Sequence, residues 1–356
     1  MNKKVIASIL VIGLAALGAG CGWFDLGPKY ADEEYTEALP QQDDLKVKMG
    51  RYDTEDGTSR QAELDPFADC PDCCIEEVGG EQSYVSGDVY ELTREAMWHV
   101  NGGLAITMGW VEAIIAYPAT EETDTGYVWG PWSDDLSRIE FRFVMDKDSS
   151  ELFAFRLEGK NINDTSDNWR TVVDGEVTPG DEPHKGVGWV RLDFDTVHDI
   201  DSSHPSADSG VVTYEFDVRE YPYKIDVKFE NFADEEETDG AFTATYNYEK
   251  REGMAGSFHF TADMDVTGPD DAPDGVLEKL DVGSEWDENG EGHGEATVSG
   301  GSLDGTSTAT YTLTECWADS EGLFYQTYAH EEVTFNDEST PVDNVVCGEE
   351  SHCPAL

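Results

Sequence analysis

An acidic segment in the second half of the chain has the residue types and spacing of a calcium-binding loop. Positions 1, 3, 5, 6 and 12 of that spacing are held by Asp263, Asp265, Thr267, Gly268 and Asp274. Oxygen ligands suit a hard cation, and the glycine permits the sharp turn that such loops need. Asp274 is shorter than the bidentate glutamate usual at position 12, and Pro269 and Pro273 oppose flanking helices. The sequence therefore predicts no cofactor: a strand that runs into an acidic turn explains these residues, and calcium binding is the alternative.

The cysteines indicate disulfide chemistry. One of the seven, Cys21, ends an export signal, and the six that remain are candidates for disulfides: Cys70, Cys73, Cys74, Cys316, Cys347 and Cys353. An even number in an exported protein favours three bridges, whose pairing the sequence does not settle. Neighbours Cys73 and Cys74 reach disulfide geometry only with strain, so we expect the 70–74 cluster to be joined to the C-terminal cysteines. A zinc site at the Cys70-x-x-Cys73 spacing is the rival, but no second pair follows at matching spacing.

A compact aromatic segment, Tyr127, Trp129 and Trp132 around Pro131, is a candidate binding platform. Aromatic rings of this kind stack on sugars or peptides. Aromatic side chains beside a sheet more often serve as core or rim packing, which is the favoured role, and the binding platform is the alternative.

Catalytic and phosphate-binding motifs are not evident along the chain, so the sequence does not indicate an enzyme. A hydrolase with an unrecognised site is the remaining enzymatic alternative. The formal net charge is −55, from 77 acidic and 22 basic residues. Such a surface repels phosphate and excludes nucleic acid as a partner. A solvated surface suited to salt and divalent-cation binding by carboxylates are two compatible interpretations of the charge.

The first 20 residues form an export signal. Lys3 and Lys4 precede an uncharged apolar run, and small residues lead into Cys21. The run is shorter than the ~20 apolar residues of a membrane span. Ala19, Gly20 and Cys21 resemble the lipobox of bacterial lipoproteins, although Gly18 stands where that family prefers leucine. The resemblance implies acylation of Cys21 and attachment to a membrane, and Gly22 in place of aspartate favours the outer membrane.

Three further segments resemble a group of bacterial surface lipoproteins without an assigned activity. They are residues 129–132 (WGPW), residues 284–286 (SEW) followed by Gly292 and Gly294, and residues 315–317 (ECW). The resemblance implies export and a β-rich fold, and it carries no activity.

Residues 21–65 are rich in acidic and amide side chains and predict a flexible tether. Such a tether would place the fold roughly 35–40 Å from the membrane. Residues 66–356 are expected to form one β-rich domain, with a possible break only at 178–186. Asp88, with Glu91 three positions later, begins a predicted helix over 88–116. Its second half is nearly uncharged, which predicts burial on all sides.

Most of the chain after Tyr127 alternates between apolar and polar residues, the pattern of antiparallel strands with one buried face. About eleven strands are predicted, and a sheet of that size curls, splits or closes. A strongly curved sheet or partial barrel around the helix is therefore the expected fold, with a β-sandwich as the alternative.

These features favour a lipid-anchored protein with a non-enzymatic binding or scaffolding role at the cell surface. The partners expected are the membrane, through the N-terminal lipid, and an unidentified protein. A carrier that holds a lipid or another apolar ligand between helix and sheet is the alternative, on fold analogy alone.

Overall fold

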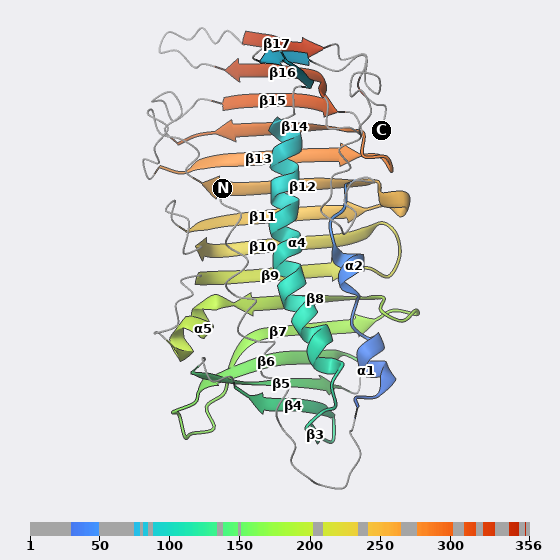
Figure 1. Ribbon diagram of the computed structural model, residues 1–356, viewed down its shortest axis with the longest axis vertical. Coiled ribbons are helices and arrows are strands. Elements are labelled where there is room, and N and C mark those ends of the chain that lie inside the picture. Colours follow the sequence, from blue (N-terminus) through green and yellow to red (C-terminus); the bar gives the residue numbers. More distant parts are fainter. Residues whose placement is uncertain are drawn as a thin grey trace. The chain divides into compact units, whose positions relative to one another are not determined.

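The structure is a computed structural model of the 356-residue chain (Figure 1). It describes residues 30–49, 75–78, 81–84, 88–133, 138–148, 151–201, 209–233, 241–264, 276–301, 310–317, 323–331, 342–348 and 353.

The chain divides into two compact units. The first unit comprises Met1–Lys46 and Asn101–Phe242, and the second comprises Val47–Val100 and Thr243–Leu356. This division differs from the single domain predicted over 66–356. The predicted break at 178–186 is instead the hairpin connection between two paired strands of the first unit.

The strands of the first unit pair in the order in which they follow one another in the chain, each antiparallel to the next. They are β3 (Glu121–Glu122), β4 (Gly126–Trp132), β5 (Ile139–Lys147), β6 (Phe153–Asn161), β7 (Arg170–Pro179), β8 (Gly186–Asp193), β9 (Ser209–Asp217) and β10 (Tyr223–Ala233). A short helix, α5 (Phe194–Ile200), connects β8 to β9, and Asp193 caps it by accepting a hydrogen bond from the Thr196 amide.

The second unit repeats this plan. Its strands also pair in chain order and antiparallel. They are β11 (Phe242–Lys250), β12 (Gly256–Met264), β13 (Glu278–Trp286), β14 (Gly292–Ser299), β15 (Thr310–Trp317), β16 (Leu323–Glu331) and β17 (Val342–Gly348). A separate hairpin joins β1 (Ile75–Val78) to β2 (Glu81–Tyr84).

The predicted antiparallel β architecture is confirmed, but the number of strands and the closure of the sheet differ from the prediction. The described residues contain fifteen strands from β3 to β17 rather than about eleven. Within each unit the first strand does not pair with the last, so the sheet is open and forms neither a partial barrel nor a sandwich. The undercount has a physical cause in strands such as β14. Its buried positions are Gly292, Gly294 and Ala296, which carry no hydrophobic signal.

The predicted long helix is confirmed as α4 (Asp88–Ile115). Its buried residues recur at helical spacing and define one stripe: Val89, Tyr90, Thr93, Ala96, Met97, Val100, Leu104, Thr107, Met108, Val111 and Ile115. The expectation that the second half is buried on all sides is wrong, because Ala113 is exposed and Gly109 and Trp110 are partly accessible.

Residues 30–49 belong to the fold, which corrects the predicted tether over 21–65. They form α1 (Glu33–Glu37) and α2 (Gln42–Leu45), shown in blue in Figure 1. Six of their side chains are buried: Tyr35, Ala38, Leu39, Leu45, Val47 and Met49. The tether was predicted from the average composition of the segment, in which acidic residues outnumber these apolar ones. Burial of the apolar side chains supplies the hydrophobic stabilisation that orders the segment.

Candidate binding surface

Two of the three predicted platform aromatics lie in the core of the first unit. Tyr127 and Trp129 on β4 are buried, and only Trp132 keeps partial access to solvent. The Tyr127 ring packs edge-on against Tyr35 at 5.0 Å, and the Trp129 ring lies 5.5 Å from that of Phe143. Burial raises the pKa of the Tyr35 and Tyr127 phenols. These contacts are those of core packing, and they tie α1 to β4.

The predicted calcium loop falls largely outside the described residues. Asp263 lies near the end of β12 and is exposed, whereas Asp265, Thr267 and Asp274 lie outside. Across the described ranges, no three His, Cys, Asp or Glu side chains converge in a way that could hold a metal ion.

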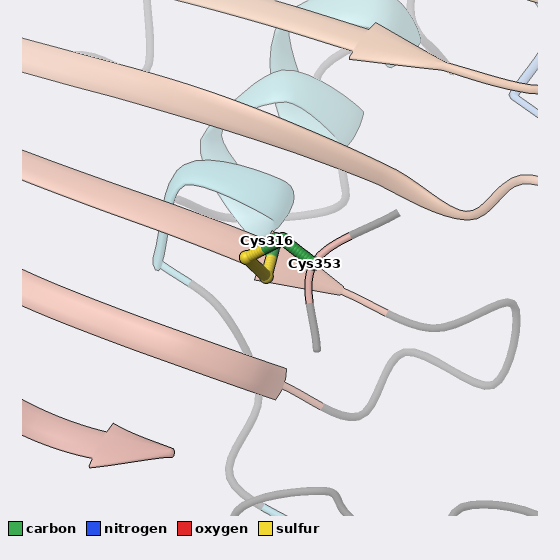
Figure 2. The surroundings of a disulfide bond; sticks show 2 residues. All are labelled: Cys316 and Cys353. Carbon is green, nitrogen blue, oxygen red and sulfur yellow. A yellow bond between two sulfur atoms is a disulfide. The ribbon is translucent and has the colours of Figure 1, made fainter. Parts of the chain in front are cut away.

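One disulfide joins Cys316 at the end of β15 to Cys353 (Figure 2). Both partners are C-terminal cysteines, so neither is available for the predicted link to the 70–74 cluster. Cys347 lies in β17, and Cys21, Cys70, Cys73 and Cys74 lie outside the described residues. The neighbouring residue Glu315 faces α4, so alternation along the strand directs Cys316 to the opposite face.

Glu315 is a buried carboxylate that caps α4 from another part of the chain. Its two oxygens accept hydrogen bonds from the backbone amides of Asp88 and Val89, each at 2.8 Å. The first amides of a helix lack partners within it, and the helix dipole favours a negative charge there. Sequence analysis missed this role, since Asp88 and Glu91 looked sufficient as a local capping pair.

Helix α4 and the strands beneath it are in direct contact within each unit. In the second unit Thr93 is hydrogen-bonded to Ser284, and a Cβ atom at Gly294 would lie 2.7 Å from Val89 Cγ1. In the first unit a Cβ atom at Gly103 would collide with the hydroxyl of Tyr214. Backbone and side chains therefore meet at these points, which leaves no room there for an apolar ligand.

The opposite side of the second unit presents a surface of small polar side chains, here called the polar face. It consists of six residues on three adjacent strands that alternate with buried ones: His259, Thr261, Asp281, Gly283, Glu295 and Thr297. The register places them in two rows, Thr261–Asp281–Thr297 and His259–Gly283–Glu295. A Cβ atom at Gly283 would meet only the His259 ring, at 3.8 Å, so the centre of the second row is open. The polar face therefore offers accessible donors and acceptors around the uncrowded position of Gly283.

The polar face carries two carboxylates, Asp281 and Glu295, and the exposed Lys279 lies beside it on the same side of β13. Asp281 lies 2.8 Å from the His259 ring nitrogen, and Glu295 receives a long hydrogen bond of 3.4 Å from Thr314. At neutral pH such a surface attracts a positively charged partner and repels an anionic one.

On the corresponding side of the first unit, a group of carboxylates on β5 and β6 is paired with basic side chains. Glu158 accepts from Arg142 at 2.6 Å and from Arg156 at 3.1 Å. Arg142 and Lys160 also lie over the Trp169 ring, at 4.4 and 4.5 Å. This network neutralises itself and holds β5 to β6 and to the segment before β7.

Within the described residues, no helix combines the length and the apolar character needed to span a bilayer. Neither a family model, nor a curated protein, nor a solved structure matches this chain.

Proposed function

We propose that the protein is a lipid-anchored extracytoplasmic lipoprotein that binds a positively charged partner through the polar face of its second unit. The observation that carries the binding role is the accessible surface around Gly283, on which the carboxylates of Asp281 and Glu295 outnumber the one lysine on the same side of β13, Lys279. The anchoring role rests on the signal that ends at Cys21.

The two roles fit together physically. A lipid at Cys21 confines the protein to a membrane surface, which raises the effective concentration of any partner on the same surface. Acidic charge on a rigid strand face then supplies attraction and orientation rather than catalysis. The direct contacts between α4 and the strands do not favour the carrier alternative.

Anchoring is tested by Cys21→Ser. The variant should lose labelling by an alkyne analogue of palmitate and should move almost completely from the membrane fraction to the soluble fraction. Fractionation of cells with a salt wash measures this. An unlabelled wild-type protein, or a variant that still sediments with membranes after the wash, would contradict lipid anchoring.

Binding is tested by photo-crosslinking in cells. A photoreactive amino acid at Thr297, within the polar face, should give a discrete adduct with one partner protein. The same group at Glu95, on the exposed side of α4 in the same unit, serves as the matched control and should give none. Glu295→Lys in the Thr297 background should reduce the adduct several-fold, because it introduces repulsion toward a cation. Equal adducts from both positions, or an adduct unaffected by Glu295→Lys, would rule out the polar face.

A further inference from the structure

The connection between the anchoring cysteine and the folded chain is short. The described chain begins at Tyr30, and α1, which starts three residues later, is tied to the first unit. Tyr35 donates its hydroxyl proton to the Thr125 carbonyl at 2.9 Å, and Glu34 forms an ion pair with Lys147 at 2.7 Å. Further along, the Gln42 amide donates to Glu112 at 3.0 Å. Of the tether predicted over 21–65, only the residues before Tyr30 therefore separate Cys21 from this part of the fold.

Chain length then limits the distance from the bilayer. Nine Cα-to-Cα steps separate Cys21 from Tyr30, which is 30 minus 21. Whatever conformation these residues adopt, they span at most about 30 Å. Tyr30 therefore cannot lie farther than this from an acylated Cys21 at the membrane surface.

The side of the first unit around Tyr30 has the features of a surface that meets lipid headgroups. The Asp32 side chain is hydrogen-bonded to Tyr127 on β4, and the Trp129 indole of the same strand donates to the Tyr117 carbonyl at 2.9 Å. Asp32 and Tyr117 thus both contact β4, and the Tyr30 and Tyr117 side chains are 60% and 47% exposed. Tyrosine is enriched at membrane–water interfaces, where an apolar ring and a polar hydroxyl are both accommodated.

We propose that this β3–β4 end of the first unit, marked by Tyr30, Tyr117 and strand β3, faces the bilayer and rests at its headgroup layer. The proposal depends on the lipid at Cys21. Exposed Glu121 and Glu122 on β3 lie at the same end, so the surface suits neutral, zwitterionic headgroups and is repelled by anionic ones. Strand β10 is six strand positions from β4 in the sheet order. At the usual strand spacing it therefore lies about 29 Å farther from the bilayer than β4 does.

Energy transfer to a labelled lipid tests the orientation. The acylated, full-length mature protein carries a fluorescent amino acid at Tyr117 or, as the matched control, at exposed Lys228 on β10. Each is bound to zwitterionic phosphatidylcholine vesicles that contain an acceptor-labelled lipid. Transfer from Lys228 should be at least about twofold lower, because six strand spacings add about 29 Å. Anionic lipid at low salt should reduce transfer from Tyr117, and salt should restore it.

A longer connection tests the role of chain length. Insertion of about 20 Gly and Ser residues after Gly22 adds a root-mean-square reach of about 25 Å. It should lower energy transfer from Tyr117 at least about twofold, because the label can then lie farther from the bilayer by this distance.

The possible outcomes separate this inference from the proposed anchor. Flotation with vesicles is measured first, with Cys21→Ser as the unanchored control. If the acylated protein does not float, the anchor itself is wrong. If it floats but Tyr117 and Lys228 transfer equally, or if the insertion changes nothing, the anchor stands and the orientation is overturned.

Discussion

Replacement of Glu315 by alanine is expected to lower the free energy of unfolding by about 2–4 kcal/mol. The side chain is fully buried, and its carboxylate accepts the first two amides of α4. Its removal leaves those donors without an acceptor, at about 1–3 kcal/mol for a buried group, and also removes the favourable interaction with the helix dipole. Urea unfolding followed by circular dichroism measures the loss.

Two further variants make this result specific. Glu315→Gln keeps an oxygen acceptor without the charge and should cost less than the alanine variant. Glu295→Ala, on adjacent β14 but exposed, should stay within about 0.5 kcal/mol of the wild type. A Glu315→Ala loss no larger than that of Glu295→Ala would show that the cap does not stabilise the fold.

Loss of the Cys316–Cys353 disulfide is expected to have an effect of similar size. The bridge closes a loop of 37 residues, and the chain-entropy relation assigns about 4 kcal/mol to such a loop. Cys353→Ser should therefore lower the free energy of unfolding by that order under oxidising conditions. It should also introduce a thiol at Cys316 that alkylates only after denaturation, because Cys316 is buried. An unchanged urea midpoint would contradict a stabilising bridge.

The Cys316–Cys353 bridge reduces the number of ways in which the other cysteines can pair. Four cysteines are left after Cys21 and this pair are set aside, and one of their three pairings joins the neighbours Cys73 and Cys74. Strain opposes that pairing. Non-reducing peptide mapping should therefore find Cys347 linked to Cys73 or to Cys74. Recovery of Cys347 as an alkylated free thiol would overturn the prediction of three disulfides.

Elements with a strong periodic signal were predictable from the sequence. Helix α4 begins at the predicted Asp88 and ends one residue before the predicted end. Strands such as β10 alternate as buried and exposed residues along most of their length, with Ile225 and Val227 inward and Asp226 outward. The hydrophobic periodicity alone locates such elements, because burial of one face requires apolar residues at regular spacing.

What could not be predicted depends on contacts between distant residues. Position 294 has room only for glycine, because Val89, which lies far earlier in the chain, fills the space beside it. For Tyr127 the sequence favoured packing over binding but did not identify the packing partner, which is the ring of Tyr35. The polar face arises from register between strands, which brings His259 and Glu295 to either side of Gly283. A single sequence carries none of these pairings explicitly.

The order of the strands has a consequence for folding during synthesis. Within each unit every strand pairs with its neighbour in the chain, so a hairpin can form as soon as both of its strands have been made. Helix α4 is made before all of these strands, yet the carboxylate that caps it lies 227 residues later, and the Trp286 indole that donates to the Lys48 carbonyl lies 238 residues after it. The apolar stripe of α4 therefore stays uncovered until its strands follow. During this interval the chain is most vulnerable to aggregation and proteolysis, and a holding chaperone would protect it.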